Sequence, residues 1–389
     1  MPEKFKLNQE AQSLLDAVNE LYPEGSVFVQ FDQDKEPVGY VRHDQAQQTT
    51  LPGGLVITVT DMTAPNYTAS HELLHLLMLL RGFPQIFFQL SLGDQQLDEQ
   101  MMIMSTDLYD VAMHRVVVAE QRKHGLIDDQ IEAEYLKGIQ STITKETGTA
   151  DDERTLRLLT LLDAIVFYGD HLDTVKDQLA ADYPVAFAAA QKMYDQIAER
   201  DIDSPFEMRR QIVKLYRLFD EQLLDWGLPA LHNNEFTTVS PVLSARQLRL
   251  KVRQVFEIFH SDMKDRKGHD DVYIGLRRND HQNSFTMHGP SGEDRSKKFV
   301  EMYDEPVEKL LTELNVPFIV RKWLHGSSRT SIIWSCAPHR VSYRSRSFDR
   351  FRHSWLSICQ WFIYAESKCG ILSESPLFCK WSRGLLRVL

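Results

Sequence analysis

The sequence predicts an α+β protein, with a short sheet and one buried helix near the N-terminus, then a mostly α-helical region, then a small α/β segment. Three observations support this. Short runs rich in β-branched residues occur before residue 62, residues 71–81 are apolar all round, and apolar residues recur at spacings of three and four from about 127 to 260. A chain of 389 residues is long enough for two or three domains. We expect its regions to span 1–145, 146–262, 263–320 and 321–389.

The first region is expected to begin with a helix over 8–21. Ser26 to Phe31 and Val38 to Arg42 predict two strands of a hairpin, and Leu55 to Asp61 predicts a third strand. The apolar segment 84–92 could line a substrate groove, although packing in the core is the simpler interpretation.

One motif indicates a chemistry directly: His71-Glu72-Leu73-Leu74-His75, an HExxH sequence. Two histidines four residues apart on a helix lie on the same face. They can therefore hold one zinc ion while Glu72 reaches a metal-bound water as general base. The alternative is a chance match, which a five-residue pattern always allows.

The surrounding segment favours a real site. Asn66 or Thr68 could cap the helix at its start, and Gly82 followed by Pro84 is expected to end it after Arg81. A helix that is apolar all round is buried, and a buried carboxylate between imidazoles is costly unless a cation neutralises it.

A catalytic zinc needs a third protein ligand. On the helix expected over 99–124, Asp110 and His114 share a face. We predict His114 as the third ligand, with Asp110 either ligating the metal or accepting the free N–H of a ligating histidine. Glu120 and Glu99 are weaker candidates, and His114 could instead be an ordinary helix histidine.

Beyond residue 145 the pattern predicts helices over 155–169, 184–200 and 205–227, and this region could bind a protein partner. A linker is expected over 228–242 and a helix over 244–260, followed by two strands within 271–289 and a helix over 296–315. Asp280, His281 and His288 invite comparison with a second metal site, but such residues are also common in polar turns.

Composition excludes several classes of protein. The net charge of −11 argues against nucleic acid as the main partner. No apolar run is long enough to span a membrane, and the N-terminus lacks the apolar core of a signal peptide. No cysteine precedes Cys336, which suits a reducing compartment, so we expect a cytoplasmic protein.

The segment 321–389 differs from the rest of the chain. It carries 12 Lys+Arg against 3 Asp+Glu, all four cysteines and five of the six tryptophans. Such an aperiodic composition suggests a frameshift near residues 320–335. A basic tail that binds an acidic partner is one alternative, and a Cys-rich metal module is another, although the cysteine spacings are unlike those of zinc ribbons.

The segment HELLHLLMLLRGFP, followed some thirty residues later by a helix of type D-x-x-x-H, resembles the bacterial IrrE/ImmA-like group of minimal zincins. The resemblance covers residues 1–145 and is carried by His71, Glu72 and His75. It implies a compact zincin-like metalloprotease domain attached to an unrelated second region. Met78 and Arg81 stand where the longer metzincin motif has Gly and His, which excludes that family.

The leading hypothesis is a zinc-dependent peptidase that acts on a peptide or protein substrate, which could pair with the strand at Leu55–Asp61. The alternative is a non-catalytic regulatory or interaction protein with a structural metal site. A third possibility is a helical binding module in which the HExxH sequence is accidental.

Overall fold

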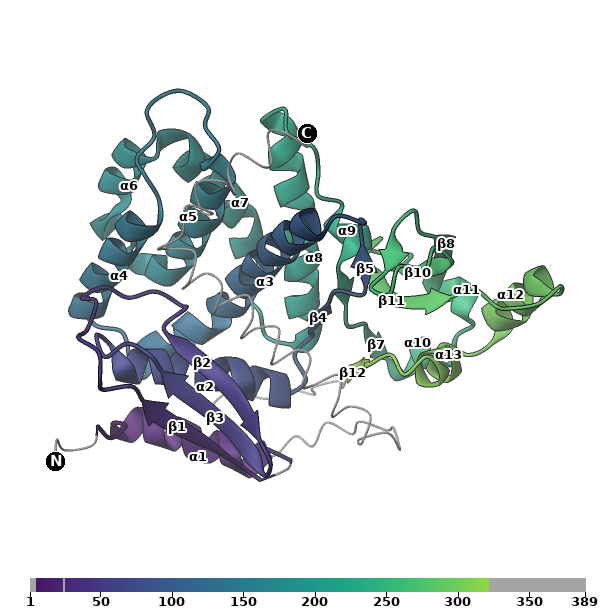
Figure 1. Ribbon diagram of the computed structural model, residues 1–389, viewed down its shortest axis with the longest axis horizontal. Helices are drawn as coiled ribbons and strands as arrows, with labels where there is room; N and C mark the ends of the chain where they lie inside the picture. The colour runs from purple at the N-terminus through teal and green to yellow at the C-terminus, as the bar shows by residue number, and fades with distance from the viewer. Residues whose placement is uncertain (1–4, 24, 322–389) are drawn as a thin grey trace.

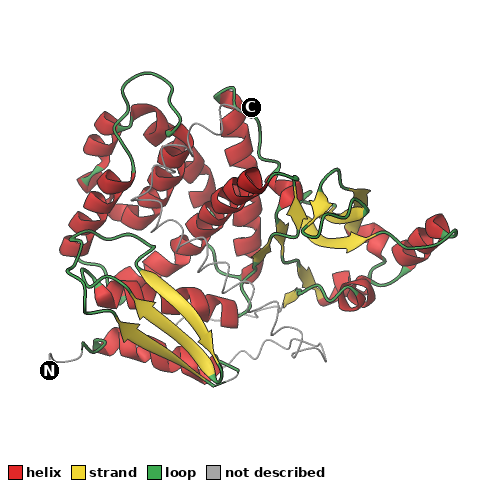
Figure 2. Ribbon diagram, viewed as in Figure 1, coloured by secondary structure: helices red, strands yellow, loops and turns green. Residues whose placement is uncertain are grey.

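The computed structural model describes residues 5–23 and 25–321, and it has the predicted α+β fold (Figure 1). In this view a three-stranded sheet with α1 (Gln9–Leu21) and α2 (Pro65–Leu80) lies at the lower left, a group of helices lies above it, and a smaller part with short strands projects to the right (Figure 2). The segment 322–389, for which the sequence suggests a frameshift, lies outside the described residues.

The N-terminal sheet has the order β1-β3-β2. Helix α1 precedes it, and its strands are β1 (Ser26–Phe31), β2 (Ala46–Leu51) and β3 (Gly54–Val59). β3 pairs in parallel with β1 and antiparallel with β2. The parallel pair approaches so closely at Gly54 that a Cβ there would lie 2.1 Å from the Ser26 carbonyl oxygen.

The predicted hairpin is wrong. Val38 to Arg42 forms an irregular loop, because Gly39 adopts a φ of 76° and the Val41 N–H donates to the carbonyl of Glu134 in α4 (Asp129–Thr142) instead of to a strand. β1 pairs with β3 instead, and the antiparallel hairpin of this sheet is formed by β2 and β3. Because β3 is central, both of its sides are paired, so the predicted pairing of a substrate with Leu55–Asp61 is also wrong. The edge that remains next to α2 belongs to β2.

Helix α2 (Pro65–Leu80) carries the HExxH residues and is buried along most of its length. It begins earlier than predicted: Pro65 occupies the first turn, Ala64 is the cap residue, and no side chain caps the helix, so Asn66 and Thr68 lie inside it. The predicted end is confirmed, because Gly82 takes a left-handed φ of 79° directly after it.

The middle of the molecule is helical, as predicted. A continuous hydrophobic core extends from Leu14 in α1 to Val239 and includes residues of all the longer helices up to α8. Helix α5 lies within this group and packs against α3 and α7. The remaining helices to this point are α1 (Gln9–Leu21), α3 (Gln95–Lys123), α5 (Arg154–Tyr168), η1 (Gly169–Thr174), α6 (Lys176–Asp182), α7 (Pro184–Ala198) and α8 (Pro205–Asp225).

After α8 the structure differs from the predictions. The expected linker is ordered and contains α9 (Asn233–Phe236), β6 (Thr238–Val239) and β7 (Val242–Ser244). The helix expected over 244–260 is divided into α10 (Ala245–Arg249), α11 (Val252–Val255) and β8 (Phe256–His260). Leu250 and Lys251 are extended, and β8 instead pairs with a neighbouring strand, a tertiary contact that outweighs the local helical pattern.

The two strands predicted within 271–289 are confirmed as β10 (Val272–Arg277) and β11 (Asn283–His288), in a sheet of order β11-β10-β8. The helix expected over 296–315 is interrupted before Pro306, giving α12 (Arg295–Asp304) and α13 (Val307–Glu313). β12 (Ile319–Arg321) pairs with β7.

Short strands join this C-terminal part to the segment between α2 and α3. β4 (Ile86–Phe87) pairs with β6, and β5 (Leu90–Ser91) pairs with β9 (Lys264–Asp265). Residues 84–92 therefore pack and pair within the protein. Among the described helices, none is both long and apolar enough to cross a membrane.

Candidate metal centre

His71 and His75 lie one turn apart on α2, with their Nε2 atoms 3.2 Å from each other. His71 is buried and His75 is half-buried. In neutral imidazoles one of these nitrogens can donate to the other, and where both rings carry their proton on Nδ1 the two Nε2 atoms are free to ligate one ion.

His114 reaches the same place from α3. Its ring centroid lies 4.7 Å from that of His71 and 5.1 Å from that of His75. Its Nδ1 lies 2.6 Å from Oδ1 of Asp163, so its Nε2 is the nitrogen left to face an ion. The rings of the three histidines that the sequence predicts as metal ligands thus lie side by side.

Asp163 in α5 orients this group. Its carboxylate accepts from Nδ1 of His114 at 2.6 Å, from Nδ1 of His43 at 3.1 Å and from the hydroxyl of Tyr135 at 3.0 Å. A carboxylate on the second nitrogen of a ligating histidine fixes its tautomer and its ring orientation. The sequence analysis assigned this role to Asp110. A lone acid within the apolar run TLLDAIVFY of α5 was the signal that could have identified Asp163.

His43 is a fourth histidine of the cluster, and sequence reasoning missed it. Its ring stacks on His71 at 4.5 Å and lies 4.3 Å from that of His114. His43, His71 and His114 offer nitrogens that all lie within 4.8 Å of one another. His43 Nε2 also lies 3.1 Å from the hydroxyl of Tyr67. Since His43 belongs to an irregular loop, no periodic pattern marks it.

The His71 ring is held from its other side by Gln121 of α3. The Gln121 side-chain oxygen lies 3.4 Å from His71 Nδ1, and its amide donates to Ser70 Oγ at 2.8 Å and to the Tyr67 carbonyl at 3.0 Å. Gln121 is fully buried. These contacts leave His71 Nε2 to face His75.

Glu72 lies beside the histidines but faces the sheet. Its Oε2 accepts a hydrogen bond of 2.9 Å from the Gln48 side chain in β2. Burial raises the pKa of Glu72, and the Gln48 hydrogen bond opposes that rise. The candidate base therefore stands between the histidine cluster and the free edge of the sheet.

Asp110 and Asp107 form a separate acidic pair on α3. Burial and then the charge of Asp107 raise the pKa of Asp110, whose Oδ1 is buried without a hydrogen-bond partner. Burial, followed by the charge of Asp163, raises the pKa of Asp107 to about 7. Glu120 lies elsewhere on α3, near Lys123 and His124.

Burial also favours the neutral forms of His71, His75 and His114. It lowers the pKa values of His71 and His75, and the neighbouring imidazoles lower them further. Burial likewise lowers the pKa of His114, against the opposing charge of Asp163. Burial disfavours the charged form of Asp163, but the two histidines outweigh this effect and hold its pKa well below the usual range.

These residues fit a divalent metal ion. Neutral imidazole is the form that ligates a metal, and three histidine nitrogens form a common zinc donor set. A nearby cation would stabilise the ionised form of the buried Glu72, and the buried Oδ1 of Asp110 has no hydrogen-bond partner.

The three residues considered for a second metal site do not come together. Asp280 pairs with Arg209 and Arg277, and His288 lies at the far end of β11. The histidine cluster is also separate from a cavity of about 460 Å³ between the start of α3 and the end of α8, since none of the cavity-lining residues belongs to the cluster.

Comparison of the chain with family models, curated proteins and solved structures finds no match.

Proposed function

We propose that this protein is a zinc-dependent peptidase of the cytoplasm, with His71, His75 and His114 holding the metal and Glu72 acting as general base. The observation that carries the proposal is the convergence of the HExxH histidines with His114, which Asp163 orients. Zinc, when bound, supplies a Lewis acid that activates water and polarises a carbonyl group.

Glu72 would accept the proton of the attacking water and later deliver it to the leaving amine. Burial raises the pKa of Glu72, which makes it a better proton acceptor than an exposed carboxylate. The Gln48 side chain keeps Glu72 in place through its hydrogen bond.

The edge of β2 would position an extended peptide. β2 is the outer strand of the sheet, so one row of its backbone groups has no partner strand, and an added peptide could pair with it. Gln48 belongs to this strand and contacts Glu72, so a peptide paired there would pass close to the base.

His43 and Tyr67 would act on the substrate oxygen. The Nε2 of His43 and the hydroxyl of Tyr67 lie 3.1 Å apart beside the cluster and can share a proton. Such donors stabilise the negative charge that develops on a carbonyl oxygen during attack.

The experiment is Glu72→Gln in the full chain, assayed with a library of casein-derived peptides. We expect turnover to fall about 10³-fold or more, because the base is lost, while the zinc content stays that of the wild type. Glu221→Gln, the same change at an exposed position on α8, should leave turnover and zinc content unchanged. Wild-type turnover in Glu72→Gln would exclude the mechanism.

A second candidate is a regulatory protein with a structural metal site, and His43 favours it. If His43 became a fourth ligand with His71, His75 and His114, the site would be closed, as structural zinc sites are. Its contacts with Tyr67 and Asp163 would then have to yield. In that case His43→Asn lowers metal affinity as strongly as His114→Ala, and no peptide is cleaved.

A further inference from the structure

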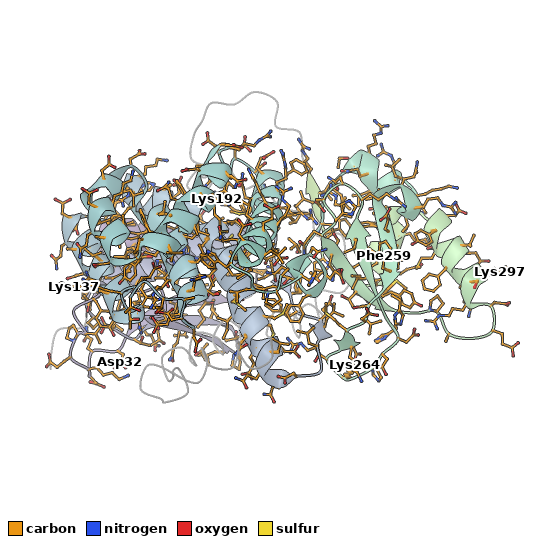
Figure 3. The ribbon with its side chains drawn as sticks, turned by 90° about the horizontal axis from the view of Figure 1, so that it is seen from above. Asp32, Lys137, Lys192, Phe259, Lys264 and Lys297 are labelled. Atoms are coloured by element: carbon orange, nitrogen blue, oxygen red, sulfur yellow. The ribbon has the colours of Figure 1, made fainter. Side chains whose placement is uncertain are left out.

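A second group of metal-binding side chains lies in the C-terminal part of the molecule, away from the histidine cluster. Asp265 ends β9, His269 follows it across a tight turn, and His288 ends β11. The carboxylate and one nitrogen from each imidazole lie within 4.8 Å of one another. Figure 3 labels the neighbouring Lys264, whose position marks this turn at the periphery of the molecule.

The Asp265 carboxylate is held in a fixed orientation. Its Oδ1 accepts from the backbone N–H groups of Lys267 and His269, both at 2.8 Å. Its side chain is only 14% exposed, unlike the histidines around it. The fixed Oδ1 leaves Oδ2 to face the two imidazoles, 2.8 Å from His269 Nδ1 and 3.4 Å from His288 Nε2.

The nearby acids differ in their partners. Asp270 pairs with Lys264, and Asp271 pairs with Arg295. Within residues 5–23 and 25–321, the ion-pair partners of Asp265 are the two histidines alone, which carry charge only when protonated. With both imidazoles neutral, the group has a net negative charge and no lysine or arginine to balance it.

The orientation of the His288 ring is also set by a contact on its second nitrogen. Its Nδ1 faces the backbone carbonyl of Asp271 at 3.4 Å, which leaves Nε2 directed at Asp265. A carbonyl on the second ring nitrogen is the usual arrangement for a histidine that binds a metal through the first.

We propose that Asp265, His269 and His288 bind a divalent transition-metal ion such as Zn²⁺. Two imidazole nitrogens and one carboxylate oxygen are donors that zinc accepts, with water completing the coordination. This site is independent of the proposed peptidase activity, because it shares no residue with the histidine cluster.

The metal would connect two parts of the structure. Asp265 pairs across the sheet with Leu90 of β5, which leads into α3 and thus toward His114. His288 belongs to the sheet of the C-terminal part. A bound ion would fasten the turn at 265–269 to β11 and so stabilise the junction between β5 and β9.

The test is equilibrium dialysis of the full chain against Zn²⁺, with the cysteines alkylated so that the thiols of the tail do not bind. Wild type and His288→Gln are compared, together with the same pair in a His71→Ala, His75→Ala background. We expect His288→Gln to lose one equivalent of zinc in both backgrounds, and Asp265→Asn to lose the same equivalent.

The matched control is His260→Gln, at an exposed histidine on β8 of the same sheet as His288, which should retain all the zinc. Zinc should also raise the melting temperature of the His71→Ala, His75→Ala chain, and His288→Gln should remove that rise. If His288→Gln and Asp265→Asn bind as much zinc as their parents, the proposal is wrong. The comparison of wild type with His288→Gln tests the proposal even if the His71→Ala, His75→Ala chain does not fold.

Discussion

At the scale of single residues, the candidate site depends on Asp163. This one carboxylate contacts His114, His43 and Tyr135, so it links α3, the loop at 40–45 and α4. Of the three proposed ligands, His114 is therefore the one whose orientation depends directly on Asp163.

We expect Asp163→Asn to weaken zinc binding at the centre about 10- to 100-fold, because an amide orients the His114 tautomer poorly and carries no charge. Competition with a fluorescent zinc chelator measures this. Asp177→Asn, at an exposed position on α6, is the control and should change nothing. Equal affinities in the two variants would show that Asp163 does not position the ligand.

Asp107 gives a prediction on stability. Burial raises its pKa from 3.8 in the unfolded chain to about 7, so the folded state holds a proton that the unfolded state releases. Ionisation of Asp107 therefore lowers the free energy of unfolding as pH rises from about 4 to 7, and this loss stays constant at higher pH.

Asp107→Asn removes this cost. Because the side chain is partly exposed, we expect a gain of about 2 kcal/mol in the free energy of unfolding at pH 8 and almost none at pH 4. Urea titrations at the two pH values measure it. An equal gain in the free energy of unfolding at pH 4 and pH 8 would mean that the charge of Asp107 does not cause the loss of stability.

At the residue scale, local spacing in the sequence predicts one part of the site and not the other. His71 and His75 are visible because helical spacing places them on one face, and Glu72 belongs to the same short motif. His114 follows from the four-residue spacing of Asp110 and His114 on the next long helix. His43 and Asp163 are brought in by the loop at 40–45 and by the packing of α5. Those are contacts between residues far apart in the chain, which no local pattern contains.

At the scale of elements, α5 supports the centre by packing. Leu162 is adjacent to Asp163 and fully buried. We expect Leu162→Ala to lower the free energy of unfolding by about 2–5 kcal/mol through the cavity it leaves. Leu224→Ala, at a leucine 60% exposed on α8, should change it by no more than about 0.5 kcal/mol. Thermal or urea unfolding measures both, and similar losses would contradict this account of α5.

The edge of β2 gives a second prediction at this scale. The Thr60 N–H donates to the Gln45 carbonyl, and hydrogen-bonded residues alternate along an antiparallel pair, so the Thr50 N–H points away from β3. Thr50→Pro would remove that donor without breaking the sheet. We expect kcat/KM for peptides to fall about tenfold, the value of one hydrogen bond, whereas Thr50→Val should keep it. Equal values in the two variants would exclude pairing at this edge.

The predicted helices and strands are confirmed where the apolar spacing in the sequence agrees with the tertiary contacts. The strands at Ser26–Phe31 and 271–289 and the helices up to residue 227 follow their periodicity. The hairpin at Val38–Arg42 and the helix over 244–260 failed because their residues pair with distant segments. Val41 bonds to Glu134, and Phe256 to His260 pairs with β10.

At the scale of the whole molecule, the centre is assembled from the N-terminal sheet region and the helices together. His43, His71 and Asp163 lie on either side of the boundary expected at residue 145, and one hydrophobic core includes residues from both sides of it. We therefore expect residues 1–145 alone to lack a complete site, because Asp163 would be absent.

The central claim is that His71, His75 and His114 hold a zinc ion. The most direct test is the zinc content of freshly purified His114→Ala compared with that of wild type, with folding of both checked by circular dichroism. The account predicts one zinc fewer per chain in the variant. An equal zinc content in the two proteins, or no zinc in either after reconstitution, would contradict it.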